Sequence, residues 1–257
     1  MLLDTHVHLL ASKKARPDWS EISYTLKVAK KKGIDLLCIT EHRDAEGFEE
    51  LYREVFIENK LGGNFESSGM LRLTSGVIIS PGAEISLAGG GDMGVHAGLN
   101  TIMSLDSQKG IYSAEGLLDV LEASCNDYVA VAHHVLVEGK WWKDFDQVVD
   151  RLDAIEVPGK HSSCLDEYLA LADKYSKGKL CGSDAHNWVQ LGAGLTFVEC
   201  GVVGSSSESS LSISSLKHYL VKNETIARLN ANADAMVAIA KFHTAQKNWM
   251  PSGETDV

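Results

Sequence analysis

Short apolar segments alternate with segments of helical periodicity along nearly the whole chain, and this alternation limits the possible folds more than any other feature. The apolar segments are rich in Val, Ile and Leu, which is typical of buried strands. The helical segments carry one apolar face, and residues 20–32 do so before Gly33 ends the predicted helix. About seven or eight such units predict an α/β protein with a parallel sheet, either open or closed into a barrel.

The predicted elements follow one another closely. Strands are expected at residues 2–3, 34–39, 77–79, 94–103, 128–132, 154–157, 179–181 and 195–200. Helices are expected at residues 20–32, 44–60, 113–123, 145–152, 165–175, 211–222 and 231–247. The polar segment 201–210 is interpreted as a surface loop, so residues 1–257 are expected to form a single domain.

The composition excludes several classes of protein. A hydrophobic fraction of 44% and a charged fraction of 23% exclude disorder at the scale of the whole chain. No stretch of about 18 apolar residues predicts a membrane span, and the first residues lack the basic and apolar regions of a secretory signal. The five cysteines are odd in number and far apart, which is typical of reduced thiols. We therefore expect a cytoplasmic protein with no membrane partner.

The charge balance argues against duplex nucleic acid as a partner. The chain has 24 Lys and Arg against 35 Asp and Glu, a net charge of -11. Its dense basic group, Lys27 with residues 30–32, lies at the end of a predicted helix, where the helix dipole favours cations. An acidic chain can still bind an anionic substrate if bound cations reverse the local field. We therefore expect a small anionic substrate and bound metal ions.

Carboxylates and imidazoles recur just past one predicted strand after another. These residues are Asp4, His6, His8, Glu41, His42, Glu84, His96, His133, His134, Glu156, His161, Asp184 and His186. In a (β/α) barrel such positions converge on the carboxyl-end face, where active sites are built from several strand ends. Imidazole nitrogens together with carboxylate oxygens suit Zn, Mn or Fe. Because the groups exceed what one ion needs, they predict at least two ions that share a carboxylate.

The chain resembles the PHP (polymerase and histidinol phosphatase) family of metal-dependent phosphoesterases in the order and spacing of its motifs between residues 4 and 186. The motifs are Asp4-x-His6-x-His8, Ile39-Thr40-Glu41-His42, Pro81-Gly82-Ala83-Glu84, His96, Ala132-His133 and Gly182-Ser183-Asp184-Ala185-His186. The resemblance implies a distorted (β/α)7 barrel, similar to a TIM barrel, with two to three divalent metal ions. It implies a first ion at His6, His8, Glu84 and Asp184, a second at Glu84, His96 and His133, and a third at His42 and His186.

The chain departs from the family pattern at three positions. Family members often carry Ser-Asp-Gly soon after the second histidine, whereas this chain has Ser12-Lys13-Lys14. The third site is then a weakly held ion, an ion completed by water, or a lysine charge in place of the ion. Glu41 replaces the usual Asp before His42, a mild change. His134 stands where Pro often follows the metal-binding histidine; we expect it to contact substrate or support a ligand.

Two further features each have two interpretations. Arg43 follows His42, so its guanidinium either binds a phosphate in bidentate fashion or forms a salt bridge at the start of the next helix. Trp141 and Trp142 either line the substrate cleft or stack on a base, or they pack against the barrel rim, and we favour the rim.

These observations predict a metal-dependent phosphoesterase that acts on a small phosphomonoester or a nucleotide-type phosphoester. A hydroxide held between the first two ions would attack phosphorus in line. Asp184 and His186 are expected to direct protons, and Asp4 is expected to orient a ligand histidine. Two alternatives remain at this stage: a C–N hydrolase of cyclic amides using the same centre, and a noncatalytic module that keeps its metals for folding.

Overall fold

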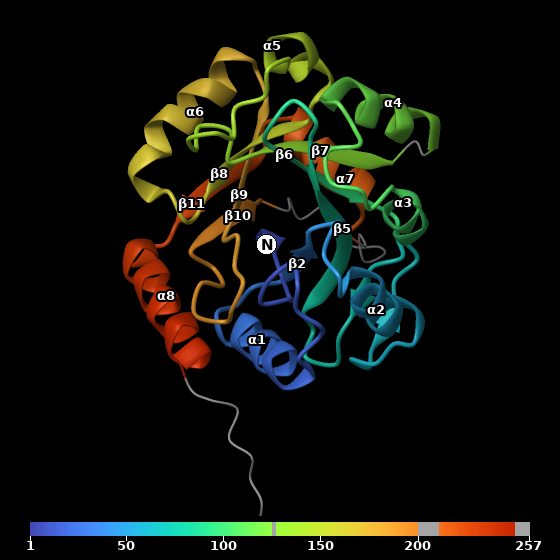
Figure 1. Cartoon of the computed structure of the whole chain (residues 1–257), viewed down its shortest axis with the longest axis vertical. Coiled ribbons are helices and arrows are strands. Elements are labelled where there is room, and N and C mark those ends of the chain that lie inside the picture. Colours follow the sequence, from blue (N-terminus) through green and yellow to red (C-terminus); the bar gives the residue numbers. More distant parts are fainter. Residues whose placement is uncertain (125–126, 200–210, 250–257) are drawn as a thin grey trace, which may run out of the picture.

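A computed structural model describes residues 1–124, 127–199 and 211–249, whose strands curve into a nearly closed barrel with helices on its outside (Figure 1). The strands are β1 (Leu2–Val7), β2 (Leu36–Ile39), β3 (Asn64–Phe65), β4 (Leu71–Arg72), β5 (Ile78–Ser86), β6 (Asp92–Ala97), β7 (Tyr128–His133), β8 (Ala154–Pro158), β9 (Gly178–Gly182), β10 (Gly194–Val198) and β11 (Thr225–Leu229). The helices are α1 (Trp19–Lys31), α2 (Phe48–Tyr52), α3 (Leu99–Ser104), α4 (Ala114–Ser124), α5 (Phe145–Val148), α6 (Leu165–Lys174), α7 (Ile213–Val221) and α8 (Ala233–Trp249).

The main path of the sheet is β11-β10-β1-β2-β5-β6-β7-β8-β9. Strands β1, β2 and β5 run parallel to one another, as do β7, β8 and β9. The chain just after β9 lies beside the end of β1, because Asp184 N donates to His6 O at 2.8 Å and His8 N donates to Ala185 O at 2.8 Å. These two bonds bring the residues that follow the first and last parallel strands to one edge of the barrel.

The expected (β/α)7 repeat is only partly realised. The described residues form an eleven-stranded mixed sheet, and β6 is antiparallel to both β5 and β7. No helix separates β5 from β6, because Gly90 and Gly91 adopt positive φ angles and turn the chain directly back. The segment predicted as one strand at 94–103 divides into the end of β6 and helix α3, while β3, β4 and β11 were not predicted. The coarser prediction of a mixed α/β, barrel-like sheet is confirmed.

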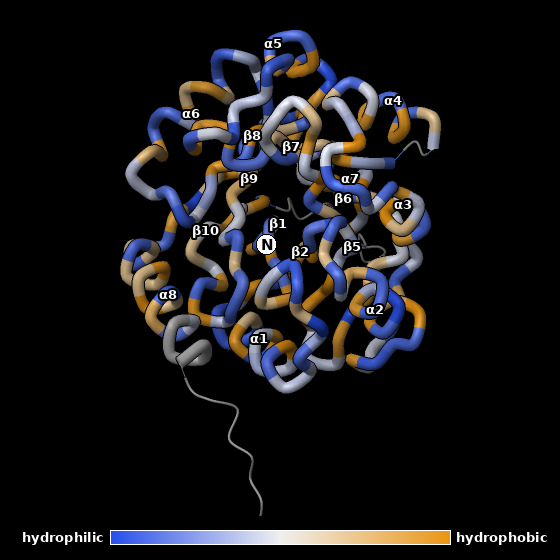
Figure 2. The backbone as a smooth tube through the Cα atoms, in the orientation of Figure 1, coloured by the Kyte–Doolittle hydropathy of each residue, from blue (hydrophilic) through white to orange (hydrophobic). Residues whose placement is uncertain are grey.

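The helices cover the barrel through amphipathic faces. Figure 2 shows apolar and polar stretches alternating along the turns of α1, which buries Ile22, Leu26 and Ala29. Helix α1 begins where the side chain of Asp18 accepts hydrogen bonds from two backbone amides at 3.0 and 3.1 Å. The helix ends just before Gly33, as predicted, whereas the Asp18 cap was not predicted.

Two expectations drawn from composition, on membrane spans and on cysteines, can be compared with the structure. In the described part of the chain, no helix is both long enough and apolar enough to cross a bilayer. Cys38, Cys164 and Cys181 are free thiols, as expected. The remaining two cysteines and the predicted loop 201–210 lie outside the described residues.

Closure of the barrel depends on the absence of a side chain at Gly182. A Cβ added there would press on the His6 side chain and lie 2.7 Å from the His6 backbone nitrogen. We expect Gly182→Ala to lower the free energy of unfolding by about 2–3 kcal/mol, because strands β9 and β1 would be forced apart. The measurement is denaturant unfolding followed by circular dichroism.

The matched control is Gly116→Ala in helix α4. A Cβ there would meet only the end of the Ser113 side chain, at 3.1 Å. This control should be neutral or slightly stabilising, since Ala favours a helix over Gly. Equal stabilities of the two variants would contradict the proposed role of the close approach.

Candidate metal centre

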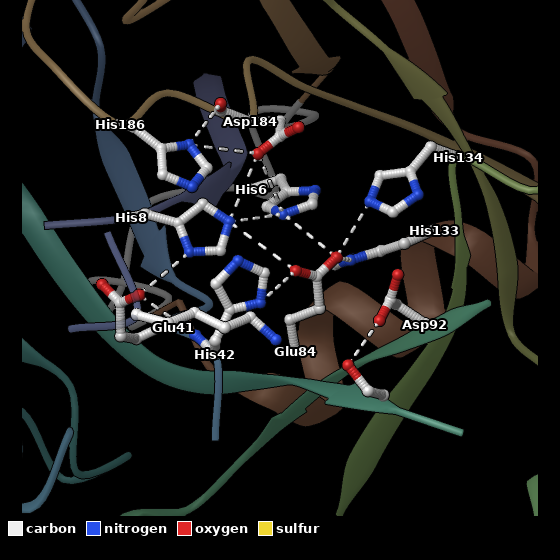
Figure 3. Close-up of polar contacts among 12 residues, drawn as sticks. His6, His8, Glu41, His42, Glu84, Asp92, His133, His134, Asp184 and His186 are labelled. Carbon is white, nitrogen blue, oxygen red and sulfur yellow. Dashed lines mark hydrogen bonds and ion pairs between the residues drawn. The ribbon is translucent and has the colours of Figure 1, made fainter. Parts of the chain in front are cut away.

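Side chains from five strands converge at one end of the barrel (Figure 3). His6 and His8 come from the end of β1, His42 from the residues after β2, and Glu84 from within β5. His133 and His134 end β7 and begin the next loop, and Asp184 and His186 follow β9. Three groups of these residues each bring their ligand atoms within 4.8 Å of one another: His6, His8 and Asp184; His6, Glu84, His133 and His134; and His8, His42 and His186.

The first group is centred on two facing imidazoles. Nε2 of His6 lies 3.0 Å from Nε2 of His8, and the Oδ1 atom of Asp184 lies 3.7 and 3.3 Å from these two nitrogens. The Asp184 backbone has a φ of 49°, in the left-handed region that non-glycine residues seldom occupy. Such strain is often found where a fold must aim a functional side chain, and here it accompanies a carboxylate that contacts both histidines.

Glu84 joins the groups, because its two oxygens face different partners. Its Oε1 atom lies 3.0 Å from Nδ1 of His133 and 2.9 Å from Nε2 of His134. Its Oε2 atom lies 2.7 Å from Nδ1 of His42 and 3.8 Å from Nε2 of His8. The carboxylate is almost completely buried. Burial alone would raise its pKa, but hydrogen bonds from the surrounding imidazoles hold the pKa well below its usual range.

The third group stacks its rings. The ring of His8 packs on His42 with centroids 4.5 Å apart and on His186 with centroids 4.2 Å apart. Lys160 joins this side of the cluster, where its ammonium lies 2.9 Å from Oδ2 of Asp184 and 3.3 Å from Nδ1 of His186. A lysine charge is therefore present beside the predicted third site, and it comes from Lys160 and not from the Ser12-Lys13-Lys14 segment.

Two buried carboxylates outside the groups fix the ligand imidazoles. Glu156 lies 2.6 Å from Nδ1 of His6 and also accepts the backbone N–H of His134 at 3.1 Å. Glu41 lies 3.2 Å from Nδ1 of His8 and accepts the backbone amides of Leu9 and Leu10 at 3.1 and 2.9 Å. In metal sites, carboxylates of this kind hold the far nitrogen of a ligand histidine and set its tautomer.

The donor set fits bound cations on its own geometry. If Nδ1 of each histidine donates to its carboxylate, the Nε2 atoms of both His6 and His8 carry lone pairs. Two lone pairs facing each other at 3.0 Å repel, unless a proton or a metal ion lies between them. His6, His8 and Asp184, with Glu84 alongside, would hold one ion, and Glu84 with His133 and His134 would hold a second.

The acid–base properties of the histidines agree with this interpretation. Burial, together with the charges of His8 and Lys160, lowers the pKa of His186 to about 2. Burial by itself lowers the pKa of His8, but the carboxylates of Glu41 and Asp184 outweigh it and raise the pKa to about 10. A proton on His8 thus compensates negative charge when no ion is bound, and an ion would displace it.

His96 lies outside the three groups. It pairs with Val129 and Gly82 in the sheet, deeper in the barrel than Glu84, because β6 runs antiparallel to its neighbours. Its ring is fully buried, and neither ring nitrogen has a hydrogen-bond partner among the described residues. Burial and the nearby imidazoles lower its pKa to about 3, so the ring is neutral. A neutral, unpaired imidazole is chemically suited to a metal, but its predicted place in the second site remains a prediction.

Two other predicted roles can be compared with the contacts in the structure. The Arg43 guanidinium donates to the carbonyls of Leu105 and Met103 and pairs with Glu49 at 2.8 Å, the salt bridge of its second interpretation. Asp4 accepts the backbone amides of Ser183 and Gly192, so it anchors the segment that carries Asp184, and its role in orienting a histidine stays a prediction. Burial, despite these hydrogen bonds, raises the pKa of Asp4 to about 7.

The two tryptophans both contact Phe145 but differ in burial. Trp142 is completely buried and packs edge-on against Phe145, whereas Trp141 is partly exposed and also contacts Phe145. Trp142 therefore belongs to the packed rim, as favoured.

No protein-family model and no curated protein matches the sequence. The crystal structure of PsfC from Pseudomonas syringae matches with a TM-score of 0.86 and 37% identity, covering 96% of this chain and 98% of that chain. The lesion-specific endonuclease PfuEndoQ from Pyrococcus furiosus matches with a TM-score of 0.62 and 16% identity, covering 86% of this chain and 56% of that chain. Endonuclease Q in complex with a 27-mer duplex bearing an abasic lesion matches with a TM-score of 0.61 and 15% identity, covering 89% and 58%. The endonuclease likenesses show a shared fold.

Sequence reasoning missed the orienting role of Glu41 and Glu156 and the place of Lys160. Glu156 lies inside a predicted strand, and an isolated buried carboxylate in a strand is itself a signal for a buried partner. Lys160 follows the end of β8, so its position just past a strand was a signal that could have identified it. Its pairing with Asp184 could not be read from the sequence, because the two residues come from different strand ends.

The convergence of the three groups predicts a multinuclear centre. We expect the purified protein, after reconstitution with Mn²⁺, to hold about two to three ions per chain, because Glu84 can serve two groups at once. Elemental analysis together with protein quantification measures this number. One ion or none per chain would contradict the multinuclear centre.

The orienting carboxylate can be tested separately. We expect Glu156→Gln to weaken metal binding by about 10- to 100-fold, because the amide no longer fixes the His6 ring with a negative charge. The measurement is competition with a metal chelator of known affinity. The matched control is Glu167→Gln on the exposed surface of α6, which should leave affinity unchanged. Unchanged affinity in both variants would assign Glu156 to packing alone.

Proposed function

This chain belongs to the protein family of PsfC from Pseudomonas syringae, and we propose that it is a metal-dependent phosphoesterase of the PHP superfamily that acts on a small phosphorylated substrate. The proposal includes two to three divalent ions of Zn, Mn or Fe and a cytoplasmic location. The position of Glu84 carries it: one buried carboxylate faces His133 and His134 with one oxygen and His42 with the other. A carboxylate that faces two groups of imidazoles could be shared by two ions, which supports a two-metal site.

When bound, such ions supply an activated water and neutralise charge on the phosphoryl oxygens. His6, His8, His42, Glu84, His133, Asp184 and His186 are the proposed ligands, with His134 added by its contact with Glu84 and His96 kept as a deeper candidate. His133 and His134 form the side of the site next to β7. Glu156 and Glu41 fix the orientation of the His6 and His8 rings through their Nδ1 atoms.

The chain's own residues provide the remaining functions. Lys160 contacts Asp184 and His186, so its ammonium is placed to hold a phosphoryl oxygen beside the ligand cluster. His186 is partly exposed beside Asp184 and is proposed as a ligand at the edge of the cluster. Asp184 contacts both the imidazoles and Lys160, so it links the ligand cluster to the ammonium. Arg43, whose Nε and Nη2 atoms contact carbonyls and Glu49, is assigned to structure.

The substrate proposed is small because the net charge of -11 opposes binding along a duplex. The related fold of endonuclease Q, which in one structure holds a duplex with an abasic lesion, makes this the point to test directly. The same metal centre would also serve a C–N hydrolase, since attack on carbonyl carbon and on phosphorus need the same groups.

A substrate screen tests the proposal. The metal-loaded protein is offered phosphomonoesters, nucleotides, cyclic amides and a duplex with an abasic site, with Mn²⁺, Zn²⁺ or Fe²⁺ supplied. We expect turnover of one or more small phosphoesters. Hydrolysis of amides alone, or cleavage of the duplex alone, would overturn the proposed substrate class.

Glu84→Gln tests the bridging role. We expect turnover of the best phosphoester to fall by roughly 100-fold or more while the circular dichroism spectrum is kept, because an amide cannot bridge two cations through two anionic oxygens. Glu167→Gln again serves as the control for loss of a carboxylate. Turnover close to that of the wild-type protein would show that Glu84 does not bridge.

A further inference from the structure

A cavity of about 530 Å³ opens beside the candidate metal centre, and helix α8 lines its far side. His186 and Lys160 line its inner end, so the cavity continues directly from the ligand cluster. Asn187 and Gln190 contribute from the loop after β9, and Lys241 with its neighbours contributes from α8. Its volume lies in the range of small-molecule sites.

The lining of this cavity is cationic in a strongly acidic protein. Two lysines line it, and no carboxylate does, although the chain has 35 Asp and Glu against 24 Lys and Arg. Lys160 at the inner end is already paired with Asp184 at 2.9 Å. Lys241 is exposed and forms no ion pair within the described part of the chain. The outer end therefore carries a positive charge that nothing described neutralises.

The neutral polar groups at the cavity also leave donors available. Oδ1 of Asn187 accepts the backbone N–H of Val189 at 3.0 Å, and Oε1 of Gln190 accepts the backbone N–H of His186 at 3.0 Å. Because each amide oxygen is used, each side chain retains its NH₂ group for another acceptor. Lysine ammonium and amide NH₂ groups together match a carboxylate or phosphate.

Helix α8 is fixed against the loop that carries the ligands. Trp188 meets His243 edge to face with ring centroids 6.0 Å apart, and Ser162 donates to Asp234 at the start of α8. The backbone N–H of Asn230, just before α8, donates to Ala193 O at 2.9 Å. Ala240, beside Lys241, is buried, so the lysine projects from a packed wall of the cavity.

We propose that this cavity binds a second anionic group of the substrate, a carboxylate or another phosphate, and that Lys241 selects for substrates carrying it. The proposal rests on the proposed function in one respect, that the first anionic group is a phosphoryl group at the metal centre. The cavity makes the preferred substrate a small molecule with two anionic ends. Lys160 contacts the end near the metal centre and Lys241 contacts the other.

Binding of matched probes tests the proposal without turnover. Isothermal titration calorimetry on the metal-loaded full chain compares 3-phosphoglycerate and 1,3-propanediol bisphosphate with glycerol 3-phosphate, which lacks the second anionic group. We expect the two doubly anionic probes to bind at least about tenfold more tightly than glycerol 3-phosphate. The difference between the carboxylate and the bisphosphate shows which second group is preferred.

Lys241→Gln should abolish this preference by weakening only the doubly anionic probes about tenfold, and Lys241→Arg should restore most of it. Lys222→Gln, which removes one positive charge at the end of α7, should change nothing. Absence of the preference, failure of all three probes to bind, or equal effects of Lys241→Gln and Lys222→Gln would overturn the proposal. If the preference depends on Lys241 but no phosphoester is hydrolysed, the cavity stands and the phosphoesterase assignment fails.

Discussion

The Nε2 atoms of His6 and His8 face each other at 3.0 Å inside the end of the barrel, and many of the surrounding contacts hold them in this position. Two imidazole lone pairs at this distance need positive charge between them. Glu156 and Glu41 contact the Nδ1 atoms of His6 and His8 and so fix the orientation of the two rings. Glu84 and Asp184 lie beside the Nε2 atoms. Burial lowers the pKa of His8 and of His134, but the surrounding carboxylates outweigh it and raise the pKa to about 10 and about 9. The cluster can therefore bind protons when no cation is present.

The construction of the barrel serves the same end. The close approach of Gly182 to His6 and the bonds between residues 184–185 and the end of β1 place two strand ends in contact. His134 and Asp184 both adopt positive φ, with values of 31° and 49°, directly beside the ligand cluster. Backbone in this region costs free energy for a non-glycine residue, and Asp4 offsets part of that cost at Asp184 by fixing the adjacent amides.

The proposed metal centre and the cationic cavity would divide recognition of the substrate between them. Carboxylates dominate the inner side, where Glu84, Asp184, Glu41 and Glu156 surround the imidazoles. Lysines and amide donors dominate the cavity toward α8. A substrate with anionic groups at both ends would meet cations at each, through the metal ions at one end and Lys241 at the other. Under this proposal, a net charge of -11 would favour such a small substrate over a long polyanion.

The sequence by itself determined the class of fold and most residues of the candidate site, because the periodicity of apolar residues and the position of a residue at a strand end are local properties. Alternating apolar and amphipathic segments predicted the α/β barrel, and the motifs selected seven of the residues that now lie in the three groups: His6, His8, His42, Glu84, His133, Asp184 and His186. Only the tertiary structure decided what depends on strand direction and on distant contacts. The reversal of β6 placed His96 deeper than a strand-end position implies, the packing of α3 occupied Arg43, and the docking of α8 brought Lys241 to the cavity. Each of these outcomes joins segments far apart in the chain, and no local pattern encodes which of them will meet.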